Sequence, residues 1–172
     1  FSLFGQDINT TVEGNSKFAF ELYKTVKDEK KNENLFFSPF SISAALAMTY
    51  AGAREDTELE MSKTLHFSLN QEKTYSDFNF ILKKIIYDSA KLSIANSLWA
   101  QKGYIFSNDY FKLLKTQYDA SLEYVDFIDN KEREKARITI NEWVENKTNN
   151  KIKDLLKEGA LNEYSRLVLV NA

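Results

Sequence analysis

Few residues in this sequence could carry out catalytic chemistry. His66 is the only histidine, it stands between Leu65 and Phe67 at the end of a predicted helix, and cysteine is absent. A Ser-His-Asp triad needs a nucleophile on a recognisable turn, and the sequence has no such signature, no glycine-rich phosphate loop and no metal-ligand spacing. The sequence therefore predicts no enzyme, cofactor or metal site. It predicts that His66 is a partly buried histidine or lies at a helix C-terminus.

Charged residues are interspersed along the chain. The 172 residues include 23 Lys and Arg against 25 Asp and Glu, which gives a net charge of −2. Lys83 and Lys84, with Lys91 nearby, come closest to a basic patch, and Asp77 and Asp88 balance them. No apolar run approaches the roughly 20 residues that cross a bilayer. We therefore expect no nucleic-acid or membrane partner, and the sequence disfavours polyanion binding.

Two short patterns concern modification and export. Asn9-Thr10-Thr11 and Asn146-Lys147-Thr148 fit the N-glycosylation pattern, so Asn9 and Asn146 are candidate acceptors, although this pattern is common by chance. The first residues lack a basic segment followed by an apolar one, so no signal peptide is visible. The lack of cysteine excludes disulfides but does not indicate a compartment.

Hydrophobic spacing places a strand and a buried helix on either side of Ser38. Leu35 to Phe37 is predicted to be a short strand, and Pro39 to Tyr50 is apolar nearly all round, which predicts a buried helix. Ser38 suits the N-cap of this helix, Pro39 suits its first turn, and Gly52 suits its C-cap.

The other elements follow from helical and alternating periodicities. The predicted helices run from Ser16 to about Val26, from Thr57 (which opens a capping box) to about Leu65, from about Gln71 to Ser89, from Ser107 to about Tyr118 and from Lys131 to Lys147. The predicted strands cover Lys91 to Ala100, Ala120 to Phe127 and Arg166 to Val170. This pattern predicts an α+β fold of roughly seven helices and three or four strands, with no internal boundary.

The last predicted strand, Leu167 to Val170, is apolar throughout and ends the sequence. Such a strand normally pairs on both sides, because an exposed edge invites aggregation. We therefore expect that a C-terminal remainder is missing, and that the isolated 172 residues are unstable or self-associate.

Several segments, taken in order, match one family pattern. They are Asn34 to Met48; Gly52 with Asp56 and Thr57; Ala95 to Trp99; Tyr118 with Val125-Asp126-Phe127; Ile140 to Val144 with Thr148, Lys151 and Ile152; and Leu167 to Ala172. Together these segments resemble the serpin family, which comprises the serine protease inhibitors and their non-inhibitory relatives. One position departs, because Asn150 stands where the family usually has Gly. Asn tolerates positive φ better than other non-glycine residues, so we expect the turn to survive.

The resemblance implies a metastable fold. Its central sheet opens to accept a reactive loop after a protease cleaves that loop, and the enzyme is trapped as an acyl-enzyme. The sheet opens at a region called the shutter, where the resemblance would place Ser38, Pro39, Ser41 and Asn171. Two hydroxyls at a helix start and an Asn near a strand end can form a polar network with two arrangements. The residues alone favour a simpler interpretation, with Ser38 as an N-cap and Ser41 as a small packing residue.

By this resemblance, residues 1–172 are the N-terminal part of a single serpin domain. Its helices would pack on strands of a large mixed β-sheet, incomplete without the C-terminal remainder. The implied function is inhibition of a target serine protease through a reactive loop beyond Ala172. A non-inhibitory serpin (carrier, chaperone or storage protein) and a self-standing interaction fragment stay open as alternatives. The family implies a secreted, extracellular protein, and an intracellular location also stays open.

Overall fold

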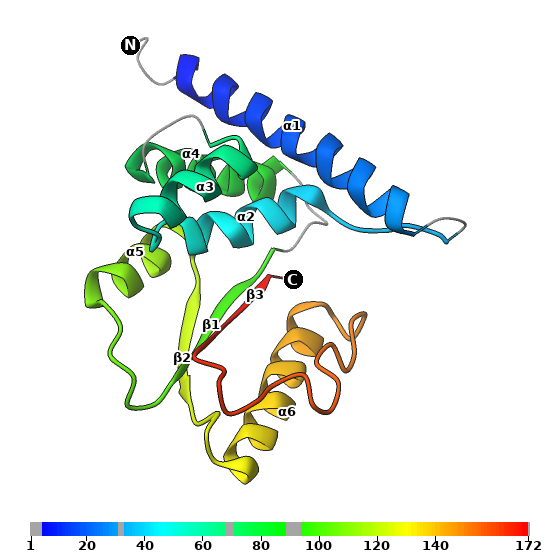
Figure 1. Cartoon of the computed structure of the whole chain (residues 1–172), viewed down its shortest axis with the longest axis vertical. Coiled ribbons are helices and arrows are strands. Elements are labelled where there is room, and N and C mark those ends of the chain that lie inside the picture. The colour runs from blue at the N-terminus through cyan, green and yellow to red at the C-terminus, as the bar shows by residue number, and fades with distance from the viewer. Residues whose placement is uncertain (1–4, 31–32, 68–70, 89–93, 172) are drawn as a thin grey trace. The chain divides into compact units, whose positions relative to one another are not determined.

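The computed structural model describes residues 5–30, 33–67, 71–88 and 94–171 (Figure 1). The chain divides into two compact units, Phe1–Lys84 and Ile85–Ala172. The first unit is helical, and the second contains a three-stranded sheet. Within the described ranges there are six helices and three strands, against roughly seven helices predicted. None of these helices is both long enough and apolar enough to cross a membrane.

The first unit is built from four helices, the last of which continues into the second unit. They are α1 (Gly5–Glu29), α2 (Pro39–Tyr50), α3 (Glu55–Leu65) and α4 (Gln71–Asp88). Apart from Tyr50 at its end, the buried side chains of α2 are small or unbranched, including Ala44, Ala47 and Met48, so neighbouring helices can approach it closely. Phe67 and Phe78 fill the space beside them, with ring centroids 5.6 Å apart.

Helix α1 begins at Gly5, so the predicted start at Ser16 is wrong. The Ser16 hydroxyl donates to the Val12 carbonyl oxygen one turn earlier, which is a mid-helix bond and not a cap. The first half of α1 faces the core with Thr11 and Gly14, both buried. Because neither is apolar, the hydrophobic pattern does not reveal that the helix extends this far.

Helix α2 has the predicted bounds, but both flanking predictions need correction. Its C-cap is Ala51 with an ordinary right-handed backbone, one residue before the predicted Gly52. Residues 35–37 are not a strand, and Phe36 is fully exposed. A strand is defined by hydrogen bonds to a neighbouring strand, and no described residue supplies that neighbour.

Helix α3 begins at Glu55, so the predicted capping box opening at Thr57 is also wrong. The N-cap is Arg54, whose side chain makes no cap bond. Acidic residues in the first turn favour this start instead, because their charge complements the helix dipole. They are Glu55, Asp56 and Glu58.

In the second unit, two helices accompany a mixed sheet of order β2-β1-β3. The elements are β1 (Asn96–Gln101), α5 (Asn108–Tyr118), β2 (Ser121–Val125), α6 (Asn130–Lys147) and β3 (Leu167–Asn171). Strand β1 is central, parallel to β2 and antiparallel to β3. The three predicted strands are confirmed with shifted ends, and residues 91–93 of the first lie outside the described residues. Ser107, the predicted start of this helix, is the N-cap of α5.

Helix α6 covers one face of the sheet (Figure 1). Its buried residues Ala136, Ile140 and Val144 join Trp99 of β1 and Val170 of β3 in one core cluster. Because strand side chains alternate, the neighbouring positions in β1 and β3 point to the opposite face. That face carries three register pairs: Asn96 with Asn171, Leu98 with Leu169, and Ala100 with Leu167.

The turn after α6 adopts the left-handed backbone that was predicted from Asn150. Asn149 has φ 51° and Asn150 has φ 60°. Asn is the residue that accepts this conformation best after glycine, so the prediction is confirmed.

Candidate functional site

The start of α2 brings three of the predicted site residues into one turn. Ser38 has an extended backbone, with φ −106° and ψ 104°, and its Oγ accepts a hydrogen bond from the Ser41 N–H at 3.2 Å. Pro39 occupies the first helical turn, where a missing N–H has no cost. The predicted N-cap is therefore confirmed. Ser38 is exposed and Ser41 is half-buried.

Sequence analysis missed a third serine, one half-turn further along the same helix. Ser43 is fully buried, and its Oγ has no hydrogen-bond partner among the described residues. A serine inside a helix usually donates to the carbonyl four residues earlier. The available signal was the spacing of Ser41 and Ser43 in an otherwise apolar helix.

In the second unit, Asn171 lies at the end of β3 and binds a second asparagine. Its Nδ2 donates to Oδ1 of Asn96 at 2.8 Å, and the two residues face one another in the antiparallel register. Asn96 is buried, and its own Nδ2 donates to the carbonyl oxygen of Tyr118 at 2.9 Å. Asn96 was not predicted as a site residue, although it lies in the segment Ala95 to Trp99.

The predicted shutter residues are thus divided between the two units. Ser38, Pro39 and Ser41 belong to Phe1–Lys84, and Asn171 belongs to Ile85–Ala172. Each group has a defined local geometry: a capped helix start in one unit and a paired strand end in the other. The assignment of all four residues to one shutter stays a prediction.

A second polar cluster attaches the start of α6 to the end of β1. The buried Gln101 side chain donates to Asp126 Oδ1 at 3.2 Å and accepts from the Phe127 N–H at 2.6 Å. The same Asp126 oxygen accepts from the backbone N–H groups of Ile128 and Asp129. The Gln101 amide, followed by these two N–H groups, lowers the pKa of Asp126.

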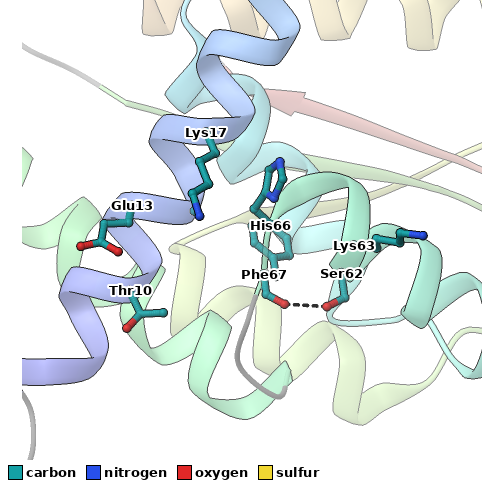
Figure 2. A pocket seen from close by; sticks show the side chains of 8 residues that line it. Thr10, Glu13, Lys17, Ser62, Lys63, His66 and Phe67 are labelled. Carbon is teal, nitrogen blue, oxygen red and sulfur yellow. Dashed lines mark hydrogen bonds between the residues drawn. The ribbon is translucent and has the colours of Figure 1, made fainter.

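Helices α1 and α3 border a cavity of about 300 Å³ in the first unit (Figure 2). His66 ends α3 with a left-handed backbone, as predicted for a partly buried histidine at a helix C-terminus. Its Nε2 donates to the Glu21 carboxylate at 2.8 Å. Lys17 extends from α1 toward this cavity (Figure 2). The neighbouring Ser62 hydroxyl donates a hydrogen bond to the Phe67 carbonyl oxygen and not to His66 (Figure 2). The cavity thus presents no serine activated by His66.

No cluster of three or more metal-binding side chains occurs in the part of the chain that the structure describes. The two candidate glycosylation residues, Asn9 on α1 and Asn146 in the last turn of α6, are exposed. Lys83 and Lys84 are exposed on α4, and Lys91 lies outside the described residues. Glycosylation and the absence of polyanion binding stay predictions.

Comparison with known proteins identifies the fold and the family. The family model described as Serpin (serine protease inhibitor) matches residues 13–172. The chain belongs to the serpin family. The leukocyte elastase inhibitor of Xenopus tropicalis is 40% identical over 157 residues, which cover 90% of this chain and 41% of that serpin.

Solved serpins share the arrangement of helices and strands. Cleaved Serpin 42Da superposes with a TM-score of 0.87 at 34% identity, over 95% of this chain and 44% of that protein. Ovalbumin from the emu, Dromaius novaehollandiae, superposes with a TM-score of 0.87 at 33% identity, over 94% of this chain and 45% of that protein. The α+β serpin fold predicted from the sequence is therefore confirmed. The chain spans less than half the length of these relatives and matches their N-terminal part.

Proposed function

We propose that the protein containing this chain inhibits a serine protease as a suicide substrate, through a reactive loop carried by a C-terminal remainder. The observation that carries this proposal is the match of residues 13–172 to a family described as serine protease inhibitors. The name of the leukocyte elastase inhibitor, which matches 90% of this chain, supports the same activity.

The open edge of β3 supports a sheet that accepts further strands. Strand β3 pairs with β1 along one edge, and in the order β2-β1-β3 its other edge has no described neighbour. Its residues Leu167–Asn171 are mostly half-buried and apolar, as suits a strand with neighbours on both sides. An unpaired edge offers N–H and C=O groups to an added strand. We place the C-terminal remainder and the inserted loop beside this edge.

The test is a titration of protease activity with the complete protein. We expect one serine protease of a panel to lose activity irreversibly, with no recovery on dilution. A non-inhibitory serpin would leave every protease active, whether or not its loop is cleaved. Unchanged activity of all proteases, together with clean cleavage of the loop, would reject inhibition and favour a carrier or storage role.

The shutter assignment is tested separately, with Ser41→Phe in the complete protein. Ser41 is half-buried, so a phenyl ring there overpacks the start of α2, at a cost of about 1–3 kcal/mol. We expect this variant to polymerise faster on mild heating. The matched control is Thr49→Phe, because Thr49 is exposed on the same helix. Equal polymerisation of both variants and the natural protein would remove Ser41 from the shutter.

Secretion of the protein also stays a prediction. The exposed residues Asn9 and Asn146 would be glycosylated only if the protein enters a glycosylating pathway. The intact mass of the protein from its natural source tests both points, because two glycans add mass that an intracellular protein lacks.

A further inference from the structure

Asn96 connects three elements of the second unit through its two amide atoms. Its Oδ1 accepts from Asn171 Nδ2 at 2.8 Å, on β3, and its Nδ2 donates to the Tyr118 carbonyl oxygen at 2.9 Å, at the end of α5. Asn96 itself is the first residue of β1 and is 6% exposed. A buried amide with a bound donor and a bound acceptor holds one side-chain orientation, because any rotation breaks a bond that water cannot replace.

The two groups that Asn96 binds both lie where a polar group needs a hydrogen bond from the protein. Tyr118 is the last residue of α5, where backbone carbonyls cannot bond within the helix, and Asp119 then turns the chain with φ 50°. Asn171 is half-buried at the end of β3, so its amide also loses water contacts. One side chain therefore satisfies a helix end and a strand end that are 53 residues apart in the sequence.

We propose that Asn96 is the positioning residue for Asn171, and that it makes the end of α5 and strand β3 move together with β1. This inference rests on the proposed function, because β3 is the strand beside which the sheet would open. Without Asn96, the Asn171 amide could rotate and the Tyr118 carbonyl would lose the hydrogen bond from Asn96. The closed sheet would then be held less firmly at the predicted shutter residue Asn171.

The test compares Asn96→Ala, Asn171→Ala and the double variant in the complete protein. The readout is the half-time of polymerisation at a fixed temperature below the melting transition. We expect each single variant to shorten the half-time at least 3-fold. The double variant should be faster than Asn171→Ala by clearly less than the factor seen for Asn96→Ala alone, because the contact with Asn171 is lost in both cases and only the bond to Tyr118 is lost in addition. The matched control is Asn108→Ala, since Asn108 is exposed at the start of α5, and its half-time should not change.

A purely structural role for Asn96 predicts a different pattern. In that case the double variant would polymerise faster than Asn171→Ala by the factor seen for Asn96→Ala alone, and the proposal would be overturned. A second measurement, on the unaltered protein, does not depend on the folding of variants. By NMR, the side-chain amide protons of Asn96 and Asn171 should exchange slowly with solvent; fast exchange of the Asn96 amide would also overturn the proposal.

Failure of this inference and failure of the proposed function are distinguishable. If the unaltered protein inhibits a protease but the Asn96 and Asn171 effects are independent, the inhibitor function stands and the coupling is rejected. If the unaltered protein inhibits no protease, the function is rejected. Slow amide exchange and non-additive variants would then still support the contact between the two asparagines.

Discussion

Replacement of Gly14 by Ala tests the packing of α1 on α3 most sharply. A Cβ at this position would lie 2.3 Å from the His66 carbonyl oxygen, where ordinary contacts begin at 3.4 Å. Relief would require the two segments to separate by about 1 Å. His66 cannot move freely, because it is the left-handed C-cap of α3 and its ring binds Glu21. The clash is therefore between the backbones of α1 and of residue 66, and no flexible side chain can move aside to relieve it.

The magnitude follows from two opposing effects. Ala is a better helix former than Gly by about 1 kcal/mol, which alone would stabilise α1. Overpacking of a close contact costs about 1–3 kcal/mol. We expect the net change in the free energy of unfolding to lie between about zero and 2 kcal/mol of destabilisation. If the backbones of α1 and His66 were not in contact, helix propensity alone would make Gly14→Ala stabilise the protein.

The assay is urea unfolding of the complete protein, followed through its first transition. The reference is the difference between Lys24→Ala and Lys24→Gly, because Lys24 is exposed on the same helix and reports helix propensity alone. Gly14→Ala could instead stabilise the protein by the same free energy by which Lys24→Ala is more stable than Lys24→Gly. That result would refute the close approach of α1 and His66.

Two further predictions concern buried and bonded polar groups. Ser43→Ala should leave stability unchanged or raise it by about 1 kcal/mol, because the buried hydroxyl has no partner among the described residues; a loss above about 1 kcal/mol in urea unfolding would mean that the hydroxyl is bonded in solution. Asp126→Asn should flatten the dependence of stability on pH. The pKa of Asp126 is held below its ordinary 3.8 in the folded state, so its contribution is present above that value and lost as pH falls through the folded pKa. Equal slopes for both proteins between about pH 5 and 2 would contradict the bond to Gln101.

Elements with a local signal could be predicted well from the sequence. Helix α2 has the predicted bounds because Ser38 and Pro39 mark its start through cap chemistry that acts within one turn. The turn at Asn150 was also predicted correctly, because positive φ depends on the residue itself. In both cases the cause lies within a few residues of the feature.

Features that depend on distant partners could not be predicted in this way. The first half of α1 is held by Thr11, whose hydroxyl donates to Asp77 on α4 at 2.7 Å, and no apolar periodicity reveals that bond. Residues 35–37 are apolar like a strand, yet strand formation depends on a neighbour elsewhere in the chain. Asn96 became visible as a candidate site residue only when its two partners were placed in space.

The central claim is that this serpin chain belongs to a protease trap, and the denatured mass of the reaction product tests it most directly. The complete protein is incubated in turn with each serine protease of a panel, and the products are boiled in SDS and weighed by mass spectrometry. We predict a covalent adduct whose mass is that of the protease plus the inhibitor, less the C-terminal peptide released by cleavage. A mixture of free protease and cleaved or intact protein, with no adduct for any serine protease tested, would contradict the account.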